Sequence, residues 1–133
     1  MQVNSYVLYN GQCEAAFRFY EQVFGGKIEA IFPYAGTPAE SQVPPEWREK
    51  IMHARMTLGE GVLMGSDTPP GRYETPKGFW VSIGVEDPAE ADRIFQALSE
   101  NATITMPIQQ TFWSKRFAML TDRFGTRWMI NCE

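Results

Sequence analysis

The sequence lacks the marks of an exported or membrane-embedded protein. Its two cysteines, Cys13 and Cys132, have no disulfide-framework spacing, which favours a reduced chain. No apolar run approaches the roughly 20 residues that a helix needs to span a bilayer. The first residues, Met-Gln-Val-Asn-Ser, lack the basic and apolar regions of a signal peptide. We therefore expect a cytoplasmic protein with no membrane partner.

Clustered positive charge is also missing. Lysine and arginine total 12 against 16 acidic residues, a formal net charge of −4, and the basic residues form no stripe. A nucleic-acid partner would require clustered cations against its phosphates, so we exclude that class of partner. No strand is followed by a glycine-rich turn that could cradle a nucleoside cofactor, and this gives no support to a methyltransferase.

The chain does have enough apolar material for a packed core. It is 133 residues long and 44% hydrophobic, which fits a single domain over 1–133. Residues 67–77 are rich in proline and polar residues, and they separate two segments of similar pattern. We predict modules 1–66 and 78–133 joined by this linker.

Each module shows the order strand–helix–strand–strand–strand. In the first module we predict a helix over 14–24 and strands over 3–9, 27–32, 53–58 and 62–66. In the second we predict a helix after Asp87 and strands over 79–85, 103–108, 116–121 and 126–131. Glu14-Ala15 aligns with Glu90-Ala91 at a constant offset, and the extra residues of the first module fall in the proline-rich loop 33–50.

Local signals mark several ends of these elements. Asn10 is the expected N-cap of the first helix, and Asp87 followed by Pro88 is a strong start for the second. Asp122-Arg123-Phe124-Gly125 predicts a tight turn that feeds the last strand. A weaker copy of this hairpin, 58–64, supports a duplicated module.

These features resemble the vicinal oxygen chelate superfamily, which includes glyoxalase I, extradiol dioxygenases and bleomycin-resistance proteins. The resemblance is carried by Phe19-Tyr20 before Gly25, by Val85 before Ala89-Glu90-Ala91, and by Asp122 before Gly125. The chain is most similar to the PhnB-like branch, some of whose members bear the name demethylubiquinone methyltransferase. The matching segments there are 43–48, 51–54, 63–67, 112–113 and 122–131.

The resemblance implies an α+β fold of two tandem βαβββ modules, the glyoxalase/bleomycin-resistance fold. In that fold the curved mixed sheets form a cup that holds a ligand, and such chains usually pair as homodimers. The superfamily's divalent metal is held by His and Glu side chains on the first and last strands of each module. Carried over by register, those positions are Ser5, Met64, Trp80 and Met129.

None of these four side chains suits a hard divalent cation. Methionine is a soft ligand, tryptophan offers no lone pair, and serine is a weak neutral ligand. The chain has a single histidine, His53. We therefore expect no metal at the usual positions and predict no cofactor, although a displaced metal site stays open.

Strand alternation predicts which side chains face the cup. Placing Met129 inward also turns Arg127 and Asn131 inward, and the same rule turns Ser5, Val7 and Tyr9 inward. The candidate catalytic residue is His53. The candidate ligand-binding residues are Arg55, Ser66, Trp80, Ser82, Trp113, Arg127, Met129 and Asn131.

Each candidate also has an ordinary structural explanation. His53 fits a hydrogen-bonded structural histidine, and Arg55 and Arg127 fit strand-face charges paired with carboxylates. The Phe112-Trp113 pair fits the rim of a cup or the anchor of a dimer. Cys13 lies at a helix start, where the dipole lowers a thiol pKa, but no cationic partner lies nearby in the sequence.

Three functions follow from these candidates. The leading hypothesis is a homodimer that binds, and could sequester, a small and partly apolar organic ligand with one anionic group. The alternative is a lyase, isomerase or dioxygenase of the superfamily that uses His53 or a displaced metal site. The third is a protein-interaction module that uses the loop around Trp47.

Overall fold

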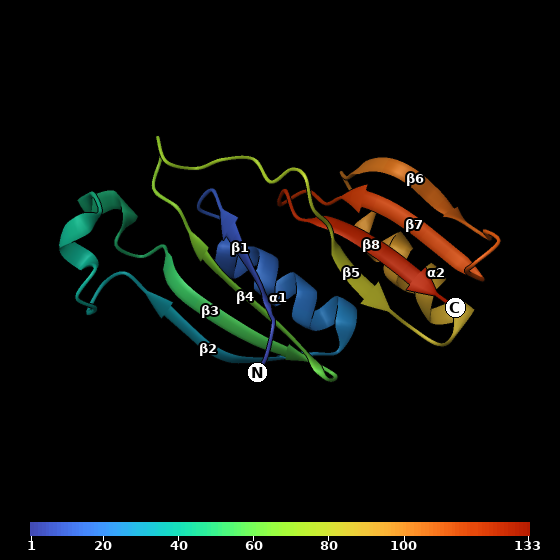
Figure 1. Ribbon diagram of the computed structural model, residues 1–133. Coiled ribbons are helices and arrows are strands. Elements are labelled where there is room, and N and C mark those ends of the chain that lie inside the picture. Colours follow the sequence, from blue (N-terminus) through green and yellow to red (C-terminus); the bar gives the residue numbers. More distant parts are fainter. The chain divides into compact units, whose positions relative to one another are not determined.

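The computed structural model describes residues 1–133 and divides into two compact units, Met1–Glu74 and Thr75–Glu133. Each unit consists of one helix and one four-stranded mixed sheet (Figure 1). This confirms the predicted α+β architecture of two βαβββ modules.

The first unit has the strand order β1-β4-β3-β2. Its elements are β1 (Ser5–Tyr9), α1 (Cys13–Phe24), β2 (Lys27–Pro33), β3 (Ile51–Leu58) and β4 (Gly61–Asp67). Strand β1 runs parallel to β4, and the other neighbouring strands are antiparallel. The proline-rich loop contains two short 3-10 turns, Glu40–Gln42 and Pro45–Trp47.

The second unit repeats this arrangement in the order β5-β8-β7-β6. Its elements are β5 (Val81–Gly84), α2 (Pro88–Leu98), β6 (Thr103–Gln109), β7 (Arg116–Thr121) and β8 (Arg127–Cys132). Strand β5 runs parallel to β8, and the other pairs are antiparallel. No helix of either unit is long and apolar enough to cross a bilayer.

One face of each sheet packs against the unit's own helix and forms the core. The apolar side of α1 is buried at Ala16, Phe17, Tyr20 and Val23, and that of α2 at Ala91, Ile94, Phe95 and Leu98. We call the opposite side of each sheet its distal face. Because side chains alternate along a strand, every residue beside a core position projects toward the distal face.

The start of α1 differs from the prediction. The helix begins at Cys13, its N-cap residue is Gln12, and no side chain of the cap residue bonds to the helix, so Asn10 is not the cap. The carboxylate of Asp67, at the end of β4, accepts a hydrogen bond from the Cys13 backbone N–H at 2.9 Å instead. The cap therefore comes from a distant part of the chain.

Asp67 is a buried junction of the first unit. Its second oxygen accepts the Ile51 N–H at 2.8 Å, and its backbone carbonyl accepts the Tyr34 hydroxyl at 2.6 Å. The residue is 1% exposed. One carboxylate thus joins the end of β4 to the starts of α1 and β3.

Asp122 is a buried junction of a different kind, within the β7–β8 hairpin of the second unit. Its carboxylate accepts the backbone N–H groups of Phe124 and Thr126 and, at 2.8 Å, the indole N–H of Trp128. Gly125 has a φ of 92°, a region that glycine enters without steric cost. The predicted turn before the last strand is confirmed.

The predicted facing of β1 is wrong. Val7 and Tyr9 are buried, with exposures of 2% and 0%, and Tyr9 packs edge-on against Phe17 of α1 at 6.1 Å between ring centroids. Ser5 pairs in register with the buried Leu63 and shares this side of the sheet. Tyr6, rather than Ser5, therefore projects on the distal face, where Met64 is its partner in register.

Gly65 makes room for this arrangement. A Cβ atom at residue 65 would lie 3.0 Å from both the Phe17 and Tyr9 rings and 2.9 Å from the Val7 carbonyl oxygen. The absence of a side chain there lets the two rings close over β4.

We predict that Gly65→Ala destabilises the protein by about 1–3 kcal/mol, the usual cost of forcing extra atoms into a packed core. Gly84→Ala on β5 is the matched control, since nothing lies within 4 Å of the Cβ it would add. Urea unfolding of both variants measures the difference. Equal midpoints for the two variants would show that Gly65 does not set the packing of β1.

Candidate functional site

The distal face of the first sheet holds His53, Arg55 and Ser66, as alternation predicts. Arg55 is opposite Met64, and Met64 is beside Tyr6. The Arg55 Nη1 atom lies 3.9 Å from the sulfur of Met64, a weak contact for a guanidinium. A cation, a thioether and a phenol therefore lie together on this face.

His53 lies between two aromatic rings. The ring centroids of Tyr6 and Phe32 are 5.7 and 6.5 Å from that of His53, with interplanar angles of 29° and 19°. The Tyr6 hydroxyl is 3.0 Å from Nδ1 of His53, within hydrogen-bonding distance. Tyr6 and Phe32 are 43% and 49% exposed, so both rings are accessible to a ligand.

The distal face of the second sheet holds the other predicted strand residues. Ser82 is beside Met129 in register, and Trp80 precedes β5 by one residue. The guanidinium carbon of Arg127 lies 3.9 Å from the centroid of the Trp80 ring system, a close cation–π contact. This contact holds Arg127 against an aromatic surface.

Asn131 and Trp113 lie on or near the same face. The Asn131 amide donates to Glu133 Oε1 at 3.0 Å, while its Oδ1 atom is buried without a hydrogen-bond partner. Trp113 packs on Phe117 at 5.4 Å between ring centroids, and Phe117 is opposite Asn131 in register. Phe112, which packs edge-on against Trp113, is 97% exposed.

Arg55 and Arg127 differ from most arginines of the chain in having no carboxylate partner. Neither forms an ion pair anywhere in residues 1–133. The arginines that lie within 4.0 Å of a carboxylate are Arg18, Arg48, Arg93, Arg116 and Arg123. The structural explanation of Arg55 and Arg127, as strand-face charges paired with carboxylates, is therefore wrong.

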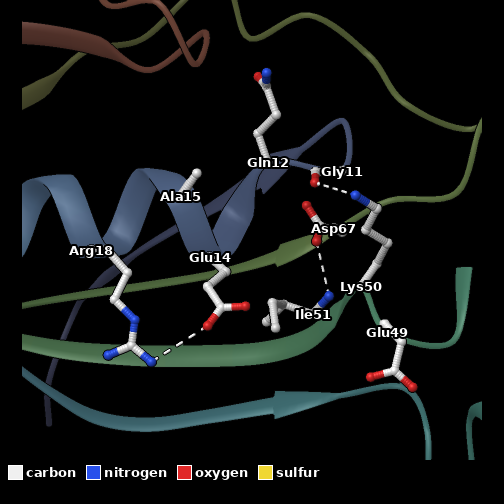
Figure 2. Close-up of a pocket in the computed structure, with 9 residues that line it drawn as sticks. All are labelled: Gly11, Gln12, Glu14, Ala15, Arg18, Glu49, Lys50, Ile51 and Asp67. Carbon is white, nitrogen blue, oxygen red and sulfur yellow. Dashed lines mark hydrogen bonds and ion pairs between the residues drawn. The ribbon is translucent and has the colours of Figure 1, made fainter.

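A pocket of about 440 Å³ lies elsewhere, at the start of α1 (Figure 2). Its charged groups already serve the fold, as the dashed lines show: Arg18 pairs with Glu14, and Lys50 donates to the Gly11 carbonyl at 3.0 Å. Burial raises the pKa of Asp67 in this pocket, against the hydrogen bonds from Ile51 and Cys13. The pocket is a structural junction, and the distal faces are the better candidate site.

The surroundings of Cys13 do not favour a nucleophilic thiolate. Burial, and then the charge of Asp67, raise the pKa of its thiol, so the thiol stays protonated at neutral pH. Both cysteines are buried and neither forms a disulfide.

Trp47 packs within its own unit. Its ring edge would lie 3.0 Å from a Cβ atom at Gly11, and the Lys50 ammonium is 5.7 Å from its centroid. The loop around Trp47 is thus fastened to the first unit at the end of β1.

Two residues of the first distal face were missed from the sequence, Tyr6 and Phe32. Tyr6 follows from strand alternation once the facing of β1 is corrected, and Phe32 follows from its pairing with His53 across β2 and β3. The signal for the correction is Gly65, whose missing side chain allows Tyr9 to face the helix.

The family is decided by the whole chain rather than by one motif. Residues 2–130 match the Glyoxalase/Bleomycin resistance protein/Dioxygenase superfamily. The chain belongs to this superfamily. The predicted membership is confirmed.

Several relatives support this membership. Protein YjdN of Escherichia coli (strain K12) is 28% identical over 139 residues, which cover 98% of this chain and 95% of YjdN. The crystal structure of protein PA1353 from Pseudomonas aeruginosa has a TM-score of 0.91 at 45% identity, covering 100% and 98% of the two chains. A PhnB protein from Bacillus cereus, described as a putative 3-demethylubiquinone-9 3-methyltransferase, has a TM-score of 0.83 over the whole of both chains. At 22% identity it supports the fold alone.

The superfamily's divalent metal does not fit the residues at its predicted positions, Ser5, Met64, Trp80 and Met129. Ser5 lies on the core side, and Tyr6 takes its place beside Met64. In the second unit Trp80 precedes β5, and the partner of Met129 in register is Ser82. Thioethers are soft ligands, and neutral hydroxyls hold hard cations weakly. No group of three or more His, Cys, Asp or Glu side chains in residues 1–133 is placed to hold a metal ion.

We predict that the purified protein, dialysed against metal-free buffer, retains far less than one equivalent of Ni, Zn, Mn or Fe, because no suitable donor set is present. Elemental analysis by mass spectrometry measures the content, and a chelator should leave the melting temperature unchanged. Stoichiometric metal that survives dialysis would contradict this assignment.

Proposed function

We propose that this superfamily member binds a small organic ligand with an anionic group at the distal faces of its sheets, without a resident metal. The proposal depends on one observation: Arg55 and Arg127 lie on those faces with no carboxylate partner. A guanidinium presents five N–H donors in a planar fork that matches a carboxylate or phosphonate. Unpaired, these donors are available to a ligand oxyanion.

The surroundings of the two guanidiniums favour a ligand that is partly apolar. Trp80 lies against Arg127, and the Tyr6 and Phe32 rings stack on His53, two residues from Arg55 on β3. Ligand sites combine apolar and aromatic walls with a few polar groups that orient the ligand. An aromatic acid is the simplest compound with both properties.

Binding without turnover, as in sequestration, suits a chain that lacks the donors for metal-assisted chemistry. The unoccupied acceptor of Asn131 and the hydroxyl of Ser82 would serve to orient the ligand. The proposal places the protein in the cytoplasm, since both cysteines are free thiols.

The proposed assembly is a homodimer. Phe112 and Trp113 form an exposed aromatic pair on a turn before β7, and aromatic residues are enriched at protein interfaces. We expect sizing chromatography with light scattering to give about twice the chain mass of 15.2 kDa. Phe112→Ala with Trp113→Ala should shift this species toward the monomer, and a wild-type monomer at all concentrations would refute the proposal.

For the ligand, we predict that benzoate binds and raises the melting temperature, whereas the isosteric neutral benzamide binds at least tenfold more weakly. Arg55→Ala and Arg127→Ala should each weaken benzoate binding about tenfold or more, since a hydrogen bond to a charged group contributes about 1.5–3 kcal/mol. Titration calorimetry measures both effects.

Arg93→Ala is the matched control, because Arg93 lies on α2 and pairs with Glu90 at 2.6 Å. It should leave the benzoate affinity within twofold of wild type. If the Arg55 and Arg127 variants behave like this control, or if benzoate and benzamide bind alike, the distal-face anion site is wrong.

A further inference from the structure

The contact between Tyr6 and His53 bears on which atom of the histidine meets a ligand. The Tyr6 hydroxyl lies 3.0 Å from Nδ1, and the ring is held between Tyr6 and Phe32. No hydrogen bond joins Nε2 to any residue of the chain. One nitrogen of His53 is therefore engaged within the unit, and the other is available.

The chemistry of the Tyr6 phenol and the His53 imidazole favours one direction for this hydrogen bond. A phenol is a better donor than acceptor, and the unprotonated nitrogen of a neutral imidazole is a good acceptor. A Tyr6 hydroxyl that donates to Nδ1 places the ring proton of the neutral imidazole on Nε2. The hydrogen bond that one ring nitrogen makes sets the state of the other.

No acidic side chain lies next to His53 on the distal face to accept a hydrogen bond from Nε2–H. The neighbours of His53 on the distal face are Tyr6 of β1, Phe32 of β2, and Ser66 of β4, all neutral. Arg55, two residues along β3, projects from the same face. An Nε2–H donor and an unpaired guanidinium therefore occupy one side of one strand.

We infer that Tyr6 is a positioning residue that holds His53 as an Nε2–H donor, and that His53 and Arg55 together bind the oxyanion of the ligand. This inference depends on the proposed function and concerns the distal face of the first unit alone. Two adjacent donors select a carboxylate or phosphonate over a neutral amide, which would leave one donor without an acceptor.

The first test uses the ligand-free protein. His53 is the single histidine, so its imidazole signals in a long-range nitrogen–proton NMR spectrum need no assignment. We expect the neutral ring to carry its proton on Nε2, with Nδ1 as acceptor. Tyr6→Phe keeps the ring stack and removes the hydroxyl, so it should shift the Nδ1 signal and admit the Nδ1–H tautomer. Tyr20→Phe, on the buried side of α1, should change neither signal.

The second test uses benzoate affinity. The side-chain amide nitrogen of glutamine can occupy the place of Nε2, whereas that of asparagine occupies the place of Nδ1. We expect His53→Gln to bind benzoate within about threefold of wild type and His53→Asn to bind about tenfold more weakly. Tyr6→Phe should weaken binding severalfold, and Tyr20→Phe should not.

The outcomes separate the two claims. If Arg55→Ala weakens binding while His53→Asn and Tyr6→Phe do not, the proposed function stands and the inference is wrong. A proton on Nδ1 in the wild-type protein also overturns the inference. If wild type binds neither benzoate nor phenylphosphonate, the proposed function fails and the inference fails with it.

Discussion

In each unit, the parallel pairing of the first strand with the last determines which side chains enter the core and which face away from it. Pairing Val7 with Gly65 buries one set of residues against α1, and the same register places Tyr6 beside Met64 on the distal face. Because side chains alternate along a strand, burying Val7 on one face necessarily places Tyr6 on the other. The packing of the helix and the chemistry of the candidate site are therefore consequences of one register.

Polar groups in this chain fall into two classes. Asp67 and Asp122 are buried and accept two or three hydrogen bonds each. Asp67 joins the end of β4 to α1 and β3, and Asp122 closes the turn between β7 and β8. Arg55 and Arg127 form no ion pair, so their charges contribute little to the stability of the fold. Groups that the fold does not use are the natural candidates for a ligand.

Much of the fold could be predicted because its signals are local. Helix periodicity and the turn from Asp122 to Gly125 depend on neighbouring residues, and both were predicted correctly. The errors concern contacts between distant residues. Asp67, rather than Asn10, bonds to the first turn of α1. The predicted facing of β1 was wrong because apolar residues lie on both of its faces, and the choice between them depends on the packing of Tyr9 and Phe17 over Gly65. The missing ion pairs of the arginines likewise depend on the tertiary structure.

The central claim is that an oxyanion, rather than a metal, occupies the site that this fold provides. A crystal structure of the protein grown with benzoate tests it most directly. The account predicts a carboxylate within hydrogen-bonding distance of the guanidinium of Arg55 or Arg127, with its ring against Tyr6, Phe32 or Trp80. Benzoate confined to the pocket beside Lys50, or a metal ion coordinated at Tyr6 and Met64, would contradict it.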